Sequence, residues 1–303
     1  MTEMIPYTEA DELLDWIALT DALAAGHDLP KALVEDVFLY SDNNTLLNRS
    51  AWIKGMGLAV KCATIFPDNR KSGKAMIGGA VNLFSAEDGA LEAILDFHLV
   101  TKWKTAADSL LAARRLARPD SSKILIVGAG TVGRSLHAAY KSAFPDAAFT
   151  VWNRSPEGAK SFQADFPDVV IADDLETAVR AADIITSATM ATEPNIFGDW
   201  LQPGQHVDLI GAYRPDMREV DDTALLRSRV FVDNMHTTVG HIGELKIPIA
   251  AGVIDASHVV ADYYDLDAFV RGLDDEITLF KNGGGAHLDL MTARYILDAW
   301  IAR

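Results

Sequence analysis

The chain has 303 residues and a net charge of −16, with 49% hydrophobic and 23% charged residues. This balance is typical of a globular protein with an ample core, and the acidic excess disfavours nucleic acids and anionic membrane surfaces as partners. The single cysteine, Cys62, excludes an internal disulfide and favours a reducing cytoplasm. The acidic N-terminus lacks the pattern of a signal peptide, and no apolar run is long enough to span a bilayer.

The first 117 residues predict a small α+β domain with an antiparallel sheet. An amphipathic helix is expected over 11–25 and a second helix over 100–116. Extended runs, separated by turn-like segments, lie between these helices. The runs are DVFLY (36–40), GLAVKCATIFP (57–67), AMIGGAVNLF (75–84) and LEAILDFHLV (91–100), and the turns are SDNN (41–44), PDNRKSG (67–73) and SAEDG (85–89).

The pattern changes near 116–122, where short β-rich runs begin to alternate with helical segments. This alternation predicts βαβ units and an α/β fold with a Rossmann doubly wound parallel sheet. The strands are expected at 123–127, 148–152, 169–172, 183–187, 206–210 and 230–233, and the helices at 131–143, 156–166, 175–181 and 221–228. A last helix, 288–302, follows the glycine run of 282–285 and is expected to return to the first domain. The predicted domains are therefore 1–117 with 286–303, and 118–285.

The hexapeptide GAGTVG (128–133) follows the strand KILIV and opens a helix, the context that makes this motif specific for a dinucleotide. Gly128 permits a tight turn, Gly130 lets backbone N–H groups approach a pyrophosphate, and Gly133 lets helix and strand pack closely. The positive end of the helix, at Thr131 and Val132, favours phosphate. We predict that these residues bind the cofactor.

Asn153 stands twenty residues after Gly133, where an NAD-binding site usually has an acid that binds the ribose hydroxyls and repels a 2′-phosphate. Asparagine carries no charge that would repel this phosphate. Arg154 can pair with it bidentately and Ser155 can donate a hydrogen bond. The sequence therefore predicts a preference for NADPH, with NADH possible; the alternative is a solvated Arg154 and a site that accepts both.

Further motifs are spread along nearly the whole chain. They are GLAVK (57–61), FPDN (66–69), TKWKTAA (101–107), VGAGTVG (127–133), SAT (187–189), IGAYRPDMRE (210–219), GEL (243–245) and FKNG (280–283). Together they resemble the ornithine cyclodeaminase/mu-crystallin family. The resemblance implies a homodimer whose first domain binds substrate and forms the dimer, a Rossmann domain that carries the cofactor, and an active site in the cleft between them. Its members deaminate and cyclise ornithine, act as alanine dehydrogenases, or reduce imines of α-keto acids.

The residue at position 213 helps to distinguish among these three activities. The resemblance implies that cyclodeaminases and alanine dehydrogenases use an aspartate two residues after the glycine that matches Gly211, and this chain has Tyr213 there. A phenol is neutral at pH 7 and a poor general base. Hydride transfer to a preformed imine needs no such base. Asp216 is expected to cap a helix or face solvent rather than replace the missing carboxylate.

Lys61 matches the family lysine that meets the substrate carboxylate. Its apolar flanks would desolvate it and lower its pKa, so we expect it to bind the carboxylate, and it is a candidate proton donor to the imine nitrogen. The alternative is a strand lysine that faces solvent. On alternation it shares a face with Ala59 and Ala63.

Other cations or amides complete the expected substrate site. Lys104 stands where the family usually has an arginine, so the charge is kept and the bidentate fork is lost. An earlier family arginine has no clear match; Asn43, Asn44 or Arg49 could replace it, and Asn44 is the candidate adopted here. Tyr213 and Gly283 are further candidate substrate contacts.

Residues that follow the later strands are candidate cofactor contacts by the same resemblance. They are Ser187, Ala188, Thr189, Ile210, Gly211 and Asn282. The alternatives are ordinary strand-end hydroxyls and a flexible hinge. Asp289 is expected to be a helix N-terminal acid. His236 and His241 lack the spacing of metal ligands, so no metal is expected.

We interpret the chain as a cytoplasmic, homodimeric oxidoreductase: an NAD(P)H-dependent imine (ketimine) reductase of proline metabolism. It would reduce Δ1-pyrroline-2-carboxylate to L-proline, with Δ1-piperideine-2-carboxylate as a second substrate. The alternatives are an ornithine cyclodeaminase, which releases ammonia, an alanine dehydrogenase, and a non-catalytic NADPH or small-molecule binding protein. The sequence leaves open the ring size, the proton donor and the strictness of the NADPH preference.

Overall fold

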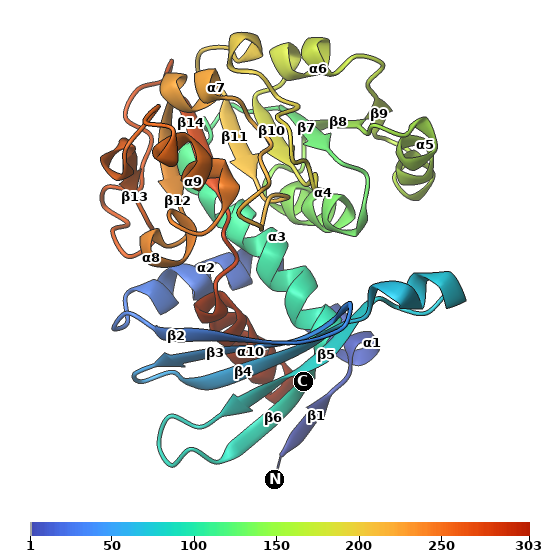
Figure 1. Cartoon of the computed structure of the whole chain (residues 1–303), viewed down its shortest axis with the longest axis vertical. Helices are drawn as coiled ribbons and strands as arrows, with labels where there is room; N and C mark the ends of the chain where they lie inside the picture. The colour runs from blue at the N-terminus through green and yellow to red at the C-terminus, as the bar shows by residue number, and fades with distance from the viewer. Residues whose placement is uncertain (1) are drawn as a thin grey trace. The chain divides into compact units, whose positions relative to one another are not determined.

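The computed structural model describes residues 2–303, which divide into two compact units (Figure 1). One comprises the chain up to Lys104 together with Gly284–Arg303, and the other comprises Thr105–Gly283. The chain crosses between them inside the long helix α3 (Phe97–Leu116) and again after Gly283. The boundaries expected from the sequence, 117/118 and 285/286, lie later, because the second half of α3 is buried in the second unit and Gly284 is bonded within the first.

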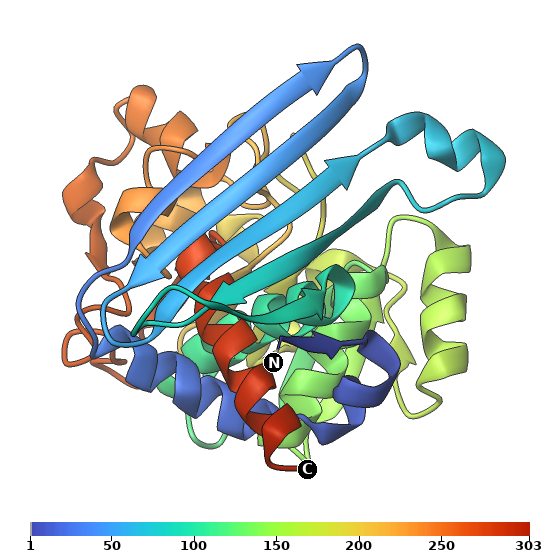
Figure 2. The ribbon, with the colours of Figure 1, turned by 90° about the horizontal axis from the view of Figure 1, so that it is seen from below.

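The first unit is built on a six-stranded sheet of order β1-β6-β5-β4-β3-β2. Neighbouring strands in this sheet are antiparallel, except for β1 and β6, which are parallel. The strands are β1 (Glu3–Ile5), β6 (Leu91–Asp96), β5 (Ile77–Phe84), β4 (Gly57–Ile65), β3 (Asn44–Ile53) and β2 (Leu33–Ser41). Helix α10 (Ala286–Ile301) lies across one face, in contact with β3, β4 and β5 (Figure 2). The predicted antiparallel α+β architecture is confirmed.

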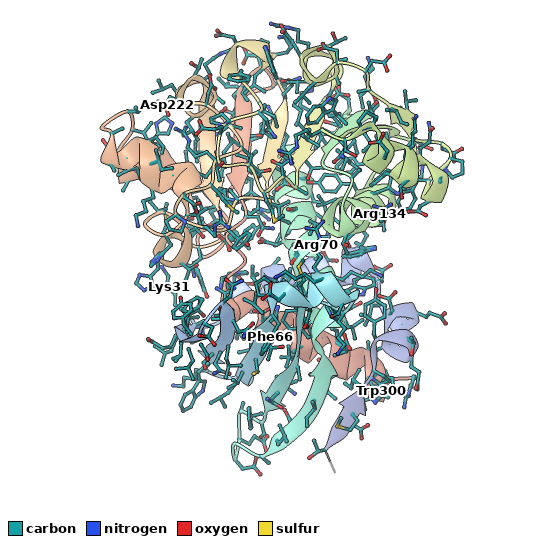
Figure 3. All side chains as sticks on the ribbon, turned by 45° about the vertical axis from the view of Figure 1, so that its right-hand side comes forward. Lys31, Phe66, Arg70, Arg134, Asp222 and Trp300 are labelled. Atoms are coloured by element: carbon teal, nitrogen blue, oxygen red, sulfur yellow. The ribbon has the colours of Figure 1, made fainter. Side chains whose placement is uncertain are left out.

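Three helical segments lie between β1 and β2: α1 (Tyr7–Ala10), η1 (Asp11–Leu13) and α2 (Trp16–His27). A fourth, η2 (Pro67–Ser72), follows β4. The helix predicted over 11–25 is present, but it is divided into η1 and α2 and extends to His27. Leu14 is extended, and Asp15 begins α2 as an N-cap that accepts a hydrogen bond from the N–H of Ala18. At the other end of this unit, Trp300 of α10, labelled in Figure 3, donates to Glu3 at 3.0 Å.

The structure differs from the sequence-based prediction at two more places in this unit, the run 91–100 and strand β3. The run 91–100 is not extended throughout, because Asp96 accepts hydrogen bonds from the N–H groups of His98 and Leu99 and so starts α3 at Phe97. Strand β3 was not predicted, since its sequence NTLLNRSAWI has no continuous apolar run. It pairs with β2 through a hairpin whose turn lies in the predicted segment 41–44, with Asp42 at a φ of 51°.

The second unit holds an eight-stranded sheet of order β13-β12-β14-β11-β10-β7-β8-β9, parallel throughout. The strands are β7 (Lys123–Val127), β8 (Ala148–Trp152), β9 (Val170–Ile171), β10 (Ile184–Ser187), β11 (His206–Leu209), β12 (Ser228–Val232), β13 (Val259–Ala261) and β14 (Ile277–Lys281). The strand order reverses between β7 and β10, which is the switch point of a Rossmann sheet. The predicted doubly wound parallel sheet is confirmed.

Helices connect these strands. They are α4 (Thr131–Ala143), α5 (Pro156–Asp165), α6 (Leu175–Ala181), η3 (Gly198–Trp200), α7 (Asp222–Arg227), α8 (Met235–Thr238), α9 (Gly243–Ala250) and η4 (Ala256–His258). Strands β13 and β14 were not predicted, because the irregular segment between them breaks the alternation of strand and helix. None of the helices in residues 2–303 combines the length and apolar character that crossing a membrane requires.

Candidate functional site

Lys61 projects from the buried face of β4, where every second residue is buried. Its side chain is only 7% exposed. The ammonium Nζ donates to Asp289 Oδ1 at 3.0 Å and to Thr101 Oγ1 at 2.8 Å, and it lies 4.7 Å from the centroid of the Phe97 ring. Burial lowers the pKa of Lys61 to about 8, and the charge of Asp289 opposes this shift. Two of three ammonium N–H donors are thus in use, which leaves one for a ligand.

Asp289 lies in the first turn of α10 and is fully buried. Its Oδ1 receives the bond from Lys61 and stands 4.0 Å from the Nζ of Lys104. Its Oδ2 has no hydrogen-bond partner within residues 2–303. Burial raises the pKa of this carboxyl, but the charges of Lys61, Lys104 and Arg49 outweigh it and hold the pKa below the ordinary value. Asp289 is therefore an ionised partner of Lys61 as well as a helix N-terminal acid.

Two more cations stand beside this pair. Arg49 lies directly across from Lys61 in the register of β3 and β4, and it forms a bidentate ion pair with Asp36 at 2.9–3.1 Å. Lys104 of α3 is 6% exposed, and its Nζ donates to the carbonyl of Gly284 at 3.0 Å. Arg49 donates to the same carbonyl at 3.0 Å. A single backbone oxygen therefore joins the two cations next to the Lys61 pair.

Asn44, the sequence-based candidate, does not belong to this group. It pairs with Ser41 at the turn of the hairpin, five residues along β3 from Arg49. The register of β3 and β4 instead brings Arg49, another of the three candidates, directly opposite Lys61.

The charges of this cluster do not cancel. Three cations, Lys61, Lys104 and Arg49, face two carboxylates, Asp289 and Asp36. Since Asp36 is partly solvated and is shared with Arg49 alone, the buried part of the cluster is positive. A single carboxylate from a ligand would neutralise it.

In the second unit, the loop between β7 and α4 has the close approaches expected of a dinucleotide loop. Gly128 has a φ of 109°, and a Cβ there would meet the carbonyl oxygen of Ala188 at 2.9 Å. A Cβ at Gly133 would lie 2.1 Å from the carbonyl oxygen of Gly128. A Cβ at Gly130 would meet nothing within 4 Å, so the space beside this residue is open.

Gly130 caps α4 without a side-chain acceptor. The first N–H groups of the helix, beginning at Thr131 and Val132, therefore have no capping side chain. Backbone donors and an open surface beside Gly130 fit a pyrophosphate.

The segment after β8 is bonded to this loop. Asn153 Oδ1 accepts from the N–H of Ala129 at 3.1 Å, and its Nδ2 donates to the carbonyl of Ser155 at 2.9 Å. Ser155 Oγ caps α5 by accepting from the N–H of Gly158 at 3.1 Å. Arg154 is exposed, and its side chain has no partner in the part of the chain that is described. Asn153 thus orders the loop, while Arg154 stays available.

Arg134 is a second arginine beside the loop, on α4 (Figure 3). All three of its guanidinium nitrogens have protein partners: they donate to Asp165 at 2.7 Å, to Ser161 at 3.1 Å and to the carbonyl of Ala129. Arg154 is therefore the arginine that remains for a ligand here.

Glu219 organises the ends of β10 and β11. Its Oε1 accepts from the hydroxyl of Ser187 at 2.6 Å and from the N–H and hydroxyl of Thr189 at 2.9 and 2.8 Å. Its Oε2 accepts from the N–H groups of Gly211 at 2.7 Å and Ala212 at 3.0 Å. The polar groups expected to meet the cofactor at these positions are thus bonded to a buried carboxylate.

Two other candidate cofactor contacts, Ala188 and Ile210, continue the hydrogen bonding of strands β10 and β11. The N–H of Ala188 donates to Val127 at 2.8 Å, and the N–H of Ile210 donates to Ser187 at 2.9 Å. Both residues stand at carboxyl ends beside the switch point, the usual place for a ligand in this fold.

Asn282 follows β14, and its Nδ2 donates to the carbonyl of Thr105 and to Ser109 Oγ, both at 3.1 Å. Gly283 is packed tightly, since a Cβ there would lie 2.0 Å from Thr238 Oγ1. This segment is fixed to the second unit by these contacts, and glycine is required by space rather than by hinge motion.

Tyr213 is 61% exposed, and the Arg214 guanidinium lies 6.0 Å from its ring centroid. Asp216 forms an exposed ion pair with Arg214 at 2.8 Å, and this contact lowers its pKa. Asp216 therefore faces solvent, which is one of the two positions that the sequence led us to expect for it.

Within residues 2–303 no group of three His, Cys, Asp or Glu side chains could hold a metal ion.

Sequence reasoning underestimated three residues. Asp289 gave only the signal of an acid near a helix start, and Arg49 was one of three candidates. Glu219 closes the motif IGAYRPDMRE, and an acid that ends a motif next to a buried strand was its only signal.

Known proteins are similar to this chain over most of its length. The model of the ornithine cyclodeaminase/mu-crystallin family matches residues 51–303. A Δ1-pyrroline-2-carboxylate reductase of Paracoccus denitrificans is 50% identical over 97% of this chain and 96% of its own length. The mouse ketimine reductase mu-crystallin is 30% identical over 80% and 76% of the two chains. The structure of Thermococcus litoralis Δ1-pyrroline-2-carboxylate reductase in complex with NADH and L-proline has a TM-score of 0.89 and 26% identity, covering 99% of this chain and 98% of the other.

Proposed function

The chain belongs to the ornithine cyclodeaminase/mu-crystallin family, and we propose that it is an NAD(P)H-dependent imine reductase that converts Δ1-pyrroline-2-carboxylate into L-proline. The relatives from Paracoccus denitrificans and Thermococcus litoralis, both named for this activity, support the reaction. Within the chain, the proposal rests on the buried cationic cluster around Lys61.

The cluster suits an imino acid with one carboxylate. Lys61, Lys104 and Arg49 would neutralise that carboxylate, and the remaining N–H of Lys61 would contact it or the imine nitrogen. With a pKa of about 8, Lys61 is protonated at neutral pH yet gives up a proton readily. The bound nicotinamide supplies the hydride that adds to C2 of the imine. Lys61 supplies the proton that the nitrogen takes up, so the C=N bond becomes the C–N bond of proline.

The same residues disfavour deamination of a diamino acid. Release of ammonia requires an activated water, and Tyr213 replaces the carboxylate that would activate it. A second ammonium group on the substrate would also enter a cluster that is already positive. The six-membered Δ1-piperideine-2-carboxylate meets both conditions and is the second expected substrate.

The cofactor would be held by 128–133, with its adenosine end beside 153–155. We propose a preference for NADPH over NADH. It is supported by the absence of an acid at Asn153 and by the exposed Arg154, whose side chain has no partner within residues 2–303. The hydroxyl of Ser155 donates to Glu157 at 3.2 Å and so adds no support.

A homodimer is also proposed, formed through the first unit. Strand β2 is an edge of its sheet and carries large exposed apolar side chains, which is typical of an interface. They are Leu33, Val37, Phe38, Leu39 and Tyr40, with Trp52 on the neighbouring strand β3. Light scattering after size exclusion would measure the mass. The cytoplasmic location stays a prediction from the sequence.

The test is a set of three reaction mixtures: NADPH with Δ1-pyrroline-2-carboxylate, NAD with ornithine, and NADH with pyruvate and ammonia. We expect rapid oxidation of NADPH in the first and L-proline as its product. Ammonia release in the second would instead identify a cyclodeaminase, and turnover only in the third an alanine dehydrogenase. Cofactor binding without turnover in any mixture would identify a binding protein.

A further inference from the structure

Asp289 does not cap the helix that carries it. It is the fourth residue of α10, past the positions whose side chains cap the first N–H groups, and the helix has no side-chain cap. One carboxylate oxygen, Oδ2, is buried without a partner within residues 2–303. A buried carboxylate is costly unless it is paired, so the partners of Asp289 must account for its presence.

The contacts of Asp289 point instead to Lys61. Oδ1 lies 3.0 Å from the ammonium nitrogen, while Thr101 Oγ1 accepts a second N–H at 2.8 Å and itself donates to the carbonyl of Phe97 at 2.7 Å. These contacts come from two helices, α3 and α10. They fix both the position of the ammonium group and the direction of its third N–H.

We propose that Asp289 is a positioning residue of the imine reduction, whose negative charge keeps Lys61 cationic and aimed at the substrate. This inference rests on the proposed function and assigns Asp289 no direct contact with substrate. Without the carboxylate, burial and the neighbouring cations would drive Lys61 to its neutral form, which neither binds a carboxylate nor donates a proton.

The surroundings of Lys61 make this dependence strong. Besides Asp289, the charges that act on Lys61 are those of Lys104 and Arg49, both positive, and burial alone disfavours the charged form of Lys61. The polar and charged groups that face it are Thr101 and Lys104 on α3, Asp289 on α10 and Arg49 on β3. His287, next to Lys104 and Asp289, is buried with a pKa well below its ordinary value because of burial, so it adds no charge at neutral pH. Asp289 is thus the anion on which the charge of Lys61 depends.

The test replaces Asp289 by asparagine, which keeps the shape and one acceptor oxygen and removes the charge. The matched control is Asp298→Asn, which removes the same charge from an exposed position on the same helix. The first measurement is the NMR titration of lysine side chains labelled with ¹³C and ¹⁵N, in which the Lys61 signal is identified by its loss in Lys61→Met. The second is kcat/KM for Δ1-pyrroline-2-carboxylate as a function of pH.

In Asp289→Asn we expect the Lys61 titration and the alkaline limb of kcat/KM to move together to lower pH, by about one to three units. Activity at the acid end should approach that of the wild type, and Asp298→Asn should match the wild type throughout. Asp289→Glu, which restores the charge, should move the titration back toward the wild-type value.

A Lys61 titration that is unchanged in Asp289→Asn, or a loss of activity that is equal at every pH, would overturn the inference. The NMR titration needs no turnover, so it separates the two hypotheses. If the wild type fails to reduce the imine, the proposed function fails; if it reduces the imine and the Lys61 titration stays in place, only the role of Asp289 fails.

Discussion

Replacing Lys61 by methionine tests the centre of the proposed mechanism. Methionine keeps the length and apolar stem of the side chain and removes the ammonium group, so packing on the buried face of β4 changes little. The variant loses both proposed roles of the lysine, carboxylate binding and proton donation. It also leaves Asp289 with no partner closer than the Lys104 ammonium at 4.0 Å.

Two magnitudes follow from this geometry. Loss of a positioned proton donor lowers a rate by about 10²–10⁴-fold, and loss of a charged hydrogen bond to the substrate costs about 1.5–3 kcal/mol more. We therefore expect kcat/KM for the imine to fall by at least about 10³-fold. Stability should fall by about 3 kcal/mol, the lower end for breaking a buried ion pair, because Lys104 and Arg49 still face Asp289.

The double variant Lys61→Met/Asp289→Asn separates these two effects. With both charges gone, the pair is neutral and of similar shape, so stability should return to within about 1 kcal/mol of the wild type. Activity should stay lost, because the ammonium group is still absent. The assays are urea unfolding followed by circular dichroism and initial rates of NADPH oxidation. If Lys61→Met keeps kcat/KM within about tenfold of the wild type, or if the double variant regains activity with its stability, Lys61 has no chemical role.

Four further predictions concern pH and the cofactor loop. Since Lys61 acts in its protonated form and has a pKa of about 8, kcat/KM should be constant below that pH and fall by roughly tenfold per pH unit above it; a flat profile to pH 10 would contradict this. Arg154→Ala should lower kcat/KM with NADPH by about 10–100-fold and leave NADH unaffected, because a charged hydrogen bond to the 2′-phosphate is lost; an equal loss with both cofactors would refute the selectivity. Gly130→Ala should weaken cofactor binding, measured by fluorescence titration, at unchanged Tm, since its Cβ meets no protein atom within 4 Å. Gly133→Ala should lower Tm, since its Cβ would lie 2.1 Å from the Gly128 carbonyl oxygen, and the opposite pattern would exclude the pyrophosphate from this loop.

The second unit was more predictable than the first, for a physical reason. Strands of a parallel sheet covered on both faces are continuously apolar, so a run such as KILIV is recognisable by itself. In the first unit, β3 is only partly buried and reads as polar, so it was missed. The run 91–100 was predicted as a single strand because apolar residues continue from the strand into the helix. Only the cap at Asp96 marks the change from one to the other.

The parts of the site that depend on residues close in sequence were predicted, and those that depend on residues far apart in sequence were not. The loop 128–133 is a local motif, and its close approaches agree with the sequence-based roles of its glycines. The bond between Lys61 and Asp289 joins residues 228 positions apart, and no local pattern encodes it. The hydroxyls of Ser187 and Thr189 could be assigned to a strand end, but their bonds to Glu219 depend on how the following loop returns.

The register of strands β2, β3 and β4 decides whether Arg49 or Asn44 lies beside Lys61, and this choice affects which substrate the site can bind. A hairpin with its turn at 41–44 brings Arg49, not Asn44, opposite Lys61. The carboxylate site then holds three cations instead of two cations and an amide, and this restricts which substrates fit it. The restriction comes from charge: one carboxylate balances the buried excess, whereas the added ammonium of a diamino acid would restore it. Arg49 thus strengthens the case for an imino acid with a single carboxylate by a route that the sequence pattern did not contain.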